Sequence, residues 1–462
     1  MQQGRCTLLS DQAGWVCDRL AGLSQVISQS TVRQVLLETK RVNARACPLT
    51  HEVVLWVVLA MGLFTNLPIR QVFKRTRFAR PGEQTPCRSA LCYARQRLGV
   101  APVRRLFLQT VRPLATPQTP GAFYKGMRLV GIDAVVFNLP DRDANANTFG
   151  RPTSGNRGEG AFPQLRKVSL VELGTHVELA FVARPITTSE QAAVPALLKH
   201  VPDDALLVWD RGYFSYNLWK TLTSRNLRVL ARVSKDVVLK PFARLRDGSY
   251  LAKIYPNGYA RQKDRGGIVV RVIRYKLDDP QRVGHDEEHV LITSLLDAEL
   301  YPASELIPLY HERWEQEGVF DEQKTHQDPR RATKPANLRS ETPAGVIQEL
   351  YALSLAHFVI RALMFEAARS VDLDPDRLSF SGCFQILQCR LPECDGRTEA
   401  TLADWYQALL EEMSRERTDP RRNRINPRVI KQKVSKWPKK RPQHFRPPRL
   451  TKTFSESVVM LN

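Results

Sequence analysis

The sequence has few acidic residues for its number of basic ones. Of its 462 residues, 47 are Asp or Glu and 69 are Lys or Arg, so the formal net charge at pH 7 is +22. A protein of that charge attracts polyanions, of which nucleic acid is the commonest. The imbalance therefore indicates a nucleic-acid partner, although a basic soluble enzyme of another kind would show the same composition.

The sequence also lacks the features of a secreted, membrane or zinc-binding protein. Its eight cysteines form no C-x-x-C pair, and no histidine cluster completes a zinc site. Residues 1–15 contain no apolar segment of the secretory type, and the longest apolar run, residues 53–64, is too short to span a bilayer. We therefore expect a cytoplasmic protein with reduced thiols and no membrane contact, in which the apolar run forms a buried helix.

Hydrophobic patterning divides the chain into a helical part, an α/β part and a basic end. Three strands, a helix, a strand, a helix and a strand between residues 121 and 235 predict a mixed α/β sheet covered by helices. Ser189 is the expected N-cap of the helix at residues 189–201. The expected regions are a helical N-terminal domain (1–120), the first part of the α/β domain (121–235), a β-rich insertion (236–290), the rest of the α/β domain with a long helix (291–370), and a C-terminal helical region with a basic tail (371–462).

Two basic segments are candidates for contact with DNA. The predicted helix at residues 88–99 carries Arg88, Arg95 and Arg97 beside two leucines, which suits contact with the DNA backbone and equally suits a solvated face of a structural helix. Residues 421–452 hold 13 Lys or Arg and no Asp or Glu, and they predict an extended basic tail that contacts phosphates or aids solubility. Three consecutive basic residues of this tail are expected DNA contacts: Lys439, Lys440 and Arg441.

Three acids occupy positions that favour a metal site. Asp133 lies inside an apolar strand, where a charge is costly unless it is paired or bound to a metal. Asp210 ends a second strand, and Glu317 lies on the helix after the sheet. Carboxylates from two strands and a helix can converge on two Mg²⁺ ions, which prefer oxygen ligands. Taken singly, Asp133 could pair with a buried arginine, Asp210 could cap the following helix, and Glu317 could be solvated.

The segment around Glu317 places charged and aromatic residues at helical spacing. In one continuous α-helix, four of them would share a narrow face, because each residue turns the helix by about 100°. These residues are Tyr310, Arg313, Glu317 and Lys324. The stripe is either a surface ladder of ion pairs or one wall of a site, in which Arg313 and Lys324 hold phosphates and Tyr310 lies near the scissile phosphate. Five further acids remain candidates, and the three on the helix lie off the stripe: Asp141, Asp143, Glu312, Glu315 and Glu322.

The spacing of the four stripe residues, Y-(2)-R-(3)-E-(6)-K, resembles the signature of the insertion sequence 4 family of bacterial DDE transposases. The strands "GIDAVVFNLPD" and "VWDRGYF" resemble the first and second aspartate motifs of that family, with Arg211 in a typical position. The segments "SALCYARQRLG" and "NPRVIKQKVSKWPKKR" are similar to the parts that flank the catalytic domain in many members. The resemblance covers most of the chain. Gly318 begins a departure from it, since relatives often carry a second acid directly after the glutamate.

The resemblance implies a ribonuclease-H-like catalytic core in which Asp133, Asp210 and Glu317 bind Mg²⁺, with Mn²⁺ as a substitute. It implies a transposase that cuts DNA at the terminal inverted repeats of its element and joins the freed 3′ ends to target DNA, with Arg211 among the DNA contacts. Because two ends must be joined, we expect a homodimer on DNA, in a nucleoid-associated protein. The alternatives are a glycosidase that uses two of the carboxylates, which would leave the basic tail unexplained, and a transposase-derived DNA-binding protein without catalytic activity.

Overall fold

The computed structural model describes residues 17–43, 47–77, 84–153, 158–280, 285–328, 338–419 and 451–461. The chain divides into two compact units. Unit 1 comprises Met1–Phe123, Asp133–Val201 and Glu315–Asp419, and unit 2 comprises Tyr124–Ile132, Pro202–Trp314 and Pro420–Asn462. Strand β2 (Met127–Asn138) contributes its first residues to unit 2 and its last residues to unit 1.

The N-terminal part of unit 1 is helical, as its sequence predicts. Its helices are α2 (Cys17–Leu20), η3 (Ala21–Gln25), α3 (Gln29–Glu38), α4 (His51–Leu63), α5 (Ile69–Thr76), α6 (Arg88–Leu98) and α7 (Ala101–Thr110). Ser28 and Thr50 cap α3 and α4, since each side chain accepts a hydrogen bond from the backbone N–H three residues later. The apolar run predicted as a buried helix is α4, in which every residue after His51 is buried.

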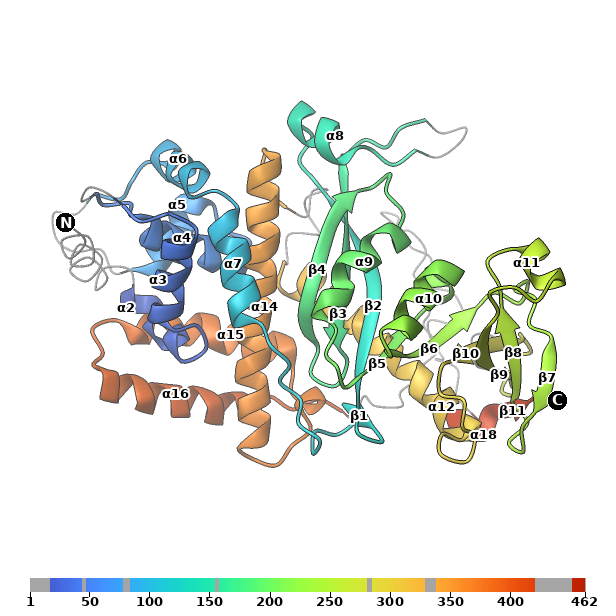
Figure 1. Cartoon of the computed structure of the whole chain (residues 1–462). Helices are drawn as coiled ribbons and strands as arrows, with labels where there is room; N and C mark the ends of the chain where they lie inside the picture. The colour runs from blue at the N-terminus through green and yellow to red at the C-terminus, as the bar shows by residue number, and fades with distance from the viewer. Residues whose placement is uncertain are drawn as a thin grey trace, which may run out of the picture. The chain divides into compact units, whose positions relative to one another are not determined.

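A long buried helix, α14 (Pro343–Arg369), belongs to the core of unit 1. It packs against α4, α7, α15 (Phe380–Arg390) and α16 (Glu399–Ser414) (Figure 1). At Gly62 of α4 a β-carbon would lie 2.2 Å from the backbone oxygen of Ala352, so the close approach of α4 and α14 requires glycine. By length and hydropathy α14 could cross a membrane, but 94% of its most apolar window is buried inside the protein, as in a core helix.

Unit 1 also contains a hairpin formed by the second and third of the three strands predicted first in the α/β part. β3 (Gln164–Glu172) and β4 (Val177–Pro185) pair antiparallel. Gln164 donates a hydrogen bond from its side chain to Asn138 (2.9 Å), which places the start of β3 beside the end of β2. The helix α8 (Asp143–Phe149) lies in the connection between β2 and β3. Two short 3-10 elements complete the C-terminal part of this unit: η11 (Pro375–Arg377) and η12 (Leu391–Cys394).

The helix predicted at residues 189–201 is broken into three short elements. These are η5 (Gln191–Ala193), α9 (Val194–Leu197) and η6 (Leu198–His200). Pro195 lies in the first turn of α9 and has no N–H to continue the turn before it, so a new helix starts there. The prediction that Ser189 caps this helix was wrong, because Glu190 precedes the first helical turn and no side chain caps it.

Unit 2 contains a sheet in which parallel and antiparallel strands meet. The remaining strands of the chain are β1 (Phe123–Tyr124), β5 (Ala205–Trp209), β6 (Arg228–Val233), β7 (Pro241–Arg244), β8 (Tyr250–Ile254), β9 (Ile268–Leu277), β10 (His289–Thr293) and β11 (Val458–Met460). In unit 2 the strand order is β2-β5-β6-β10-β9-β8-β7. β5 is parallel to both β2 and β6, and α10 (Tyr216–Ser224) connects β5 to β6.

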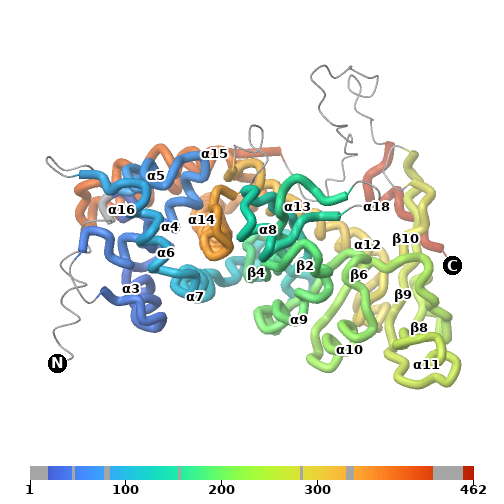
Figure 2. The backbone as a smooth tube through the Cα atoms, turned by 90° about the horizontal axis from the view of Figure 1, so that it is seen from above, coloured from blue at the N-terminus to red at the C-terminus, as the bar shows by residue number. Residues whose placement is uncertain are grey.

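The β-rich region predicted as an insertion extends the sheet of unit 2. β10 pairs antiparallel with β6, and β9, β8 and β7 follow as antiparallel neighbours. The end of the chain joins the same sheet, since α18 (Phe454–Ser457) leads into β11, which pairs with β9 (Figure 2). The basic segment predicted as a tail is therefore internal. Its candidate contacts Lys439, Lys440 and Arg441 lie outside the described residues.

The elements follow the order predicted for a ribonuclease-H-like core. β2, β3 and β4 come first along the chain, and the parallel strands β5 and β6 follow, with helical segments between them. The predicted fold class is confirmed: a mixed sheet with a β-rich extension, preceded by a helical region and followed by helices. In α/β sheets of this kind, functional groups gather at the carboxyl ends of the parallel strands.

Candidate active site

The first two predicted acids follow paired residues of parallel strands. In unit 2, Ile132 of β2 pairs with Trp209 of β5. Asp133 and Asp210 are the next residues of the two chain segments. The register of β2 and β5 in unit 2 therefore ends at the residues directly before the two acids, of which Asp133 belongs to unit 1 and Asp210 to unit 2.

Each of these two carboxylates is oriented by the residue that follows it. Oδ1 of Asp133 accepts a hydrogen bond from the N–H of Ala134 (2.8 Å), and Oδ1 of Asp210 accepts one from the N–H of Arg211 (2.6 Å). Asp210 thereby caps the 3-10 turn η7 (Arg211–Tyr213), whereas the helix predicted after it, α10 (Tyr216–Ser224), is capped by Ser215. Both aspartates are partly exposed, which leaves them accessible to an ion from solvent.

The helix that carries the predicted stripe is interrupted twice. α12 (Ala303–His311) is followed by the 3-10 turn η8 (Glu312–Trp314), then by α13 (Glu315–Asp321) and the π-helical turn η9 (Glu322–His326). The prediction of one continuous helix with a single narrow face was wrong. Turns of 3-10 and π type advance by angles other than the 100° of an α-helix, so the four stripe residues do not share one α-helical face.

The boundary between the units also falls inside this segment. Tyr310 and Arg313 belong to unit 2, whereas Glu317 and Lys324 belong to unit 1. The stripe residues therefore have to be described in two groups.

In unit 2, Tyr310 is buried, and the charge of Asp210 affects the pKa of its hydroxyl. Its side chain is 5% exposed. Burial raises the pKa of the Tyr310 hydroxyl, the guanidinium of Arg313 opposes that rise, and the carboxylate of Asp210 adds to it. The guanidinium of Arg313 lies 5.2 Å from the centre of the Trp314 ring. Unit 2 thus brings together the second acid, the tyrosine and the arginine.

In unit 1, Lys324 contacts β2 just beyond the first acid. Its Nζ donates a hydrogen bond to the backbone oxygen of Val136 (2.6 Å) and lies 5.4 Å from the centre of the Phe137 ring. Glu317 lies two helical turns before Lys324 and is partly buried in α13. A phosphate held by Lys324 would share its ammonium group with this carbonyl oxygen.

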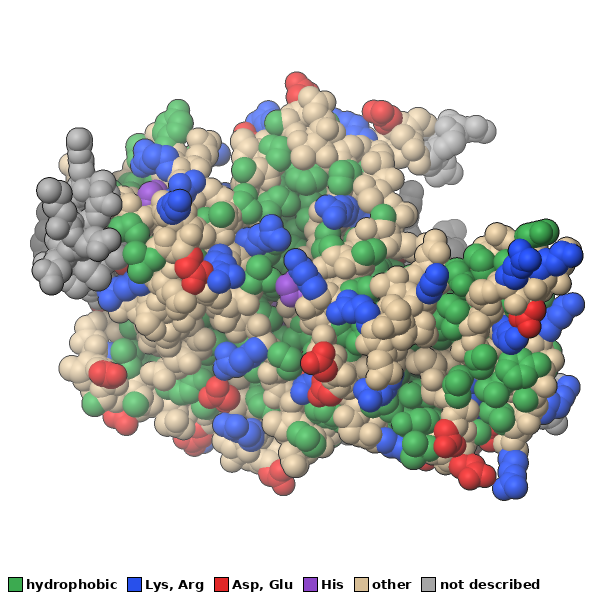
Figure 3. All heavy atoms as spheres, in the orientation of Figure 1, with side chains coloured by type: hydrophobic (Ala, Val, Ile, Leu, Met, Phe, Trp, Pro, Cys, Tyr) green, Lys and Arg blue, Asp and Glu red, His purple; other side chains and the backbone are tan. Residues whose placement is uncertain are grey.

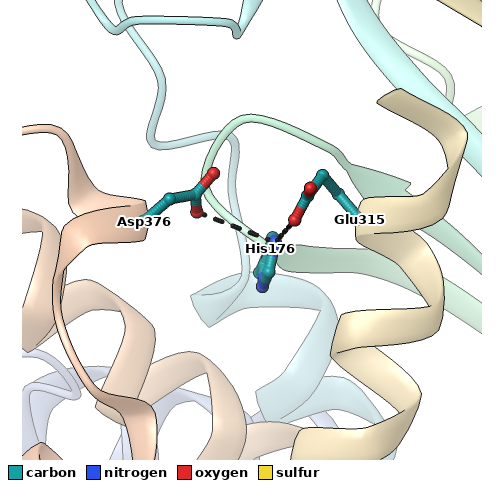
Figure 4. Close-up of side chains that lie close together, drawn as sticks. All are labelled: His176, Glu315 and Asp376. Carbon is teal, nitrogen blue, oxygen red and sulfur yellow. Dashed lines mark hydrogen bonds and ion pairs between the residues drawn. The ribbon is translucent and has the colours of Figure 1, made fainter. Parts of the chain in front are cut away.

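Two glutamates that the spacing argument set aside, Glu315 and Glu322, belong to a cluster around the buried His176. Figure 4 shows His176 with Glu315 and Asp376. The imidazole Nε2 lies 2.8 Å from Oε2 of Glu315 and 3.7 Å from Oδ1 of Asp376. The imidazole Nδ1 lies 3.0 Å from Oε1 of Glu322. Arg361 of α14 donates from Nε to Oε2 of Glu322 (2.9 Å) and also contacts His176. Sequence reasoning missed this cluster, although a charged Arg361 inside the strongly apolar α14 was a sign of a buried acidic partner.

The electrostatics of this cluster favour paired charges. Burial and the neighbouring guanidinium lower the pKa of His176, but the surrounding carboxylates outweigh both and raise it to about 9. Burial would raise the pKa of Glu322, but Arg361 and His176 hold it well below its usual range. Two cations thus face three carboxylates. His176, Glu315 and Asp376 have the composition of a metal site, but the two cations already offset most of the carboxylate charge.

The three arginines of α6 lie in different surroundings. Arg88 and Arg97 are exposed. Arg95 donates from Nε to the side chain of Gln348 (2.8 Å) and also donates to the backbone oxygen of Gly345, both on α14. Burial lowers the pKa of Arg95. Arg95 therefore joins α6 to α14, and its predicted role as a phosphate contact conflicts with these bonds, whereas Arg88 and Arg97 remain candidates.

Basic side chains also gather over α11 (Gly258–Gln262) and the neighbouring strands of unit 2 (Figure 3). Arg211, which directly follows Asp210, is exposed in the same unit. The exposed basic residues on and around α11 and β7 are Arg244, Arg246, Arg261, Lys263 and Arg265. This surface has the charge expected of a protein that contacts DNA phosphates.

Comparison with known proteins identifies the class of enzyme. The insertion element 4 transposase N-terminal family matches residues 18–108, and the transposase DDE domain family matches residues 124–358. The chain is 29% identical over 426 residues to the transposase InsG for insertion sequence element IS4 of Escherichia coli (strain K12). The aligned residues cover 91% of this chain and 93% of that protein. It is 29% identical over 197 residues to the putative transposase InsZ of the same organism, covering 42% of this chain and 64% of that protein.

Among solved structures, the chain is similar to the piggyBac transposase in a synaptic complex with hairpin DNA, with a TM-score of 0.42, 13% identity and 87% of each chain covered. The DDE domain alone spans just over half of the chain, and it defines a DNA transposase, an enzyme that binds DNA and depends on a divalent metal ion. The chain belongs to the insertion sequence 4 family of these transposases. The resemblance drawn from the four-residue signature and the two aspartate motifs is confirmed, and the glycosidase alternative was wrong.

Proposed function

We propose that Asp133, Asp210 and Glu317 hold two Mg²⁺ ions at the centre of DNA cleavage and strand transfer, with Mn²⁺ as a substitute. The observation that carries the proposal is the register of β2 and β5 in unit 2, which ends at the residues directly before the two aspartates. Three carboxylates fit the preference of Mg²⁺ for hard oxygen ligands, and the aspartates are partly exposed. The ions would activate the attacking oxygen and stabilise the leaving 3′ oxygen of the phosphodiester.

The side chains around the acids are proposed to hold the DNA backbone. Arg313 would grip a flanking phosphate through its guanidinium, and Lys324 would act as a point charge on another. Tyr310 would lie near the scissile phosphate, supported by its closeness to Asp210 and Arg313 in unit 2. Arg211 is exposed next to Asp210 and would contact the backbone from the turn η7.

The regions of the chain are proposed to divide this work. Residues 1–120 form the DNA-binding domain, with the exposed Arg88 and Arg97 as contacts. Residues 121–235 and 291–370 form the catalytic domain, with the β-rich region 236–290 between its two parts. The last region, 371–462, contains C-terminal helices and the basic segment.

Assembly on DNA follows from the reaction. Two element ends have to be cut and joined to one target, so a homodimer on the terminal inverted repeats is the simplest active form. The basic segment, with Lys439, Lys440 and Arg441, is proposed to contact phosphates in that complex. A bacterial enzyme with these partners works in the cytoplasm, at the nucleoid.

A cleavage assay tests the proposed metal site. Purified protein and Mg²⁺ are incubated with a labelled duplex that carries the inverted repeats flanking the gene. We expect nicks at the repeat ends with the wild type and none with Glu317→Gln, while end binding is retained. Glu341→Gln, the same substitution at a half-exposed glutamate of unit 1, is the matched control and should cleave normally. Cleavage by Glu317→Gln at the wild-type rate would remove Glu317 from the metal site, and end binding without nicks in any of the proteins would point to the inactive alternative.

A further inference from the structure

We infer that His176 is a positioning residue for the cleavage reaction, which fixes the helix that carries Glu317 on the β3–β4 hairpin and so sets the direction of the Glu317 carboxylate. The inference rests on the proposed metal role of Glu317. It concerns a residue that lies more than a hundred positions from Glu317 in the sequence and outside the four-residue signature. The contacts that carry it all lie within unit 1.

The backbone of His176 is held in a conformation that few residues adopt. His176 is the last residue of the turn between β3 and β4, and its φ of 59° lies in the left-handed region, which is unfavourable for a residue with a β-carbon. Side chains of hairpin turns usually point into solvent. The side chain of His176 is nonetheless only 2% exposed and points into the protein. Strained backbone of this kind persists where surrounding contacts fix it, and it is common at functional sites.

The imidazole of His176 touches α13 and η9 at three places on one side. Nε2 lies 2.8 Å from Glu315 and Nδ1 lies 3.0 Å from Glu322. Between them, a β-carbon on Gly318 would lie 3.2 Å from the imidazole Cε1, so the absence of a side chain there permits the close approach. The departure from the family pattern at Gly318 thus coincides with the contact to His176.

Glu317 points away from the side of the helix that His176 touches. Successive residues of α13 are rotated by about 100°, so Glu317 is directed roughly 200° from Glu315 and roughly 100° from Gly318. A contact that fixes the rotation of α13 about its own axis therefore fixes the direction in which Glu317 projects. A shift or rotation of this short helix would move the carboxylate with it.

The far side of the cluster is fixed by α14. Arg361 bonds Glu322, and the imidazole of His357 lies 2.9 Å from the same carboxylate. Asp376, in η11, is buried against Nε2 of His176 at 3.7 Å. Charges in a buried network are held strongly when every member is satisfied, and removal of one member disturbs the rest. The hairpin, the glutamate helix and α14 are thereby connected through one imidazole.

The test compares His176→Gln and His176→Ala with a buried control. Glu349→Gln removes another fully buried carboxylate of unit 1, bonded to Arg339 and Ser340 and not to the glutamate helix. Single-turnover cleavage is measured across a Mg²⁺ titration, beside end binding and thermal unfolding. We expect His176→Ala to raise the half-saturating Mg²⁺ concentration and to slow cleavage by about 10-fold. His176 contacts the helix and not Glu317 itself, so the effect should stay below the ~100-fold upper range for loss of a direct partner of a metal ligand. His176→Gln, which can still donate to Glu315, should recover part of both losses.

Gly318→Ala tests the same contact without removing any hydrogen-bonding or charged group of the cluster. The added methyl group would press on the imidazole, whereas alanine favours a helix more than glycine does. We expect a raised Mg²⁺ requirement without a lower unfolding temperature, which a purely structural role would not produce.

Two outcomes would overturn the inference. One is a wild-type Mg²⁺ requirement in His176→Ala and Gly318→Ala. The other is a loss of cleavage in His176→Ala that matches its loss of thermal stability, as in Glu349→Gln, with no change in the Mg²⁺ titration. Failure of the proposed function itself gives a different result, because Glu317→Gln would then cleave normally whatever the His176 variants do.

Discussion

The strand acids and the helix acid of the proposed site are held in different ways. Asp133 and Asp210 each accept a hydrogen bond from the backbone N–H of the next residue, and each directly follows a residue of the paired strands β2 and β5. Glu317 lies on a helix whose place depends on side chains that are far away in the sequence. The comparison teaches that backbone hydrogen bonds, within the turn and between strands, hold the aspartates, whereas the glutamate needs a buried network of polar side chains.

The network under the glutamate helix extends beyond His176. Gln316 donates to the backbone oxygen of Ser169 in β3 (3.0 Å), and Gln323 donates to Glu178 in β4 (3.1 Å). The ammonium of Lys167 bonds both Glu178 and Gln323. Burial raises the pKa of Glu178, but Lys167 outweighs it and holds the pKa below its usual value. Polar contacts thus hold both ends of the helix to the hairpin.

The largest expected effect comes from the strand acids themselves. Asp133→Asn and Asp210→Asn should each lower single-turnover cleavage by more than ~100-fold, because loss of a ligand exceeds loss of a ligand's partner. Their unfolding temperatures should stay close to the wild type, since an asparagine oxygen accepts the same backbone N–H. Cleavage rates and thermal unfolding measured on the same preparations check both parts. A large loss of stability in either variant would show that the aspartates depend on more than their neighbours.

Breaking the network should instead lower stability. Glu322→Gln leaves Arg361 buried without its carboxylate partner and should cost about 3–5 kcal/mol of unfolding free energy. Glu411→Gln, which breaks an exposed pair with Arg415, is the control and should change it by less than about 1 kcal/mol. Denaturant unfolding of both variants measures the difference. Equal stabilities for the two variants would mean that the buried network does not hold the helix.

The contrast between the strand aspartates and the glutamate helix also explains which parts of the site could be predicted from the sequence. Apolar strands that contain an acid or end in one are local patterns, and they located Asp133 correctly inside β2 and Asp210 directly after β5. The interruption at η9 is not local, because its Glu322 contacts His176 and α14, which lie far away in the chain, and Glu315, the first residue after η8, also contacts His176. The angular argument for a single stripe therefore failed, although the spacing of its residues identified the family.

Pairing between residues far apart in the sequence also explains why the strand at the C-terminal end was not predicted. The basic composition of residues 421–452 predicted an extended basic tail, and residues 421–450 lie outside the described residues. The residues after it form β11, which pairs with β9 from a distance of about 180 positions along the chain. The short segment "VVM" gives no sign of its partner, so the return to the sheet could not be read from composition.

The protonation of His176 should appear in the pH dependence of stability. A folded pKa of about 9 exceeds the value near 6.5 of an unperturbed histidine, so protonation stabilises the fold fully below pH 6.5. That contribution, on the order of 3 kcal/mol, is lost as the pH rises from 6.5 to about 9. The difference in unfolding free energy between the wild type and His176→Asn should therefore shrink over this interval. A difference that is constant from pH 6 to 9.5 would show that the imidazole does not carry the charge that the cluster implies.

The smallest expected effect separates two arginines of one helix. Arg97 is exposed on α6, whereas Arg95 bonds Gln348 and Gly345 of α14. Arg97→Ala should weaken binding to element ends and reduce the slope of log affinity against log salt by about 1, as expected for one lost phosphate contact, with unchanged stability. Arg95→Ala should lower the unfolding temperature and leave the salt slope unchanged, because its guanidinium is already used inside unit 1. If Arg95→Ala changes the salt slope as much as Arg97→Ala does, Arg95 breaks its bonds to α14 when DNA binds. Its guanidinium then exchanges a contact that stabilises the free protein for a contact with a phosphate.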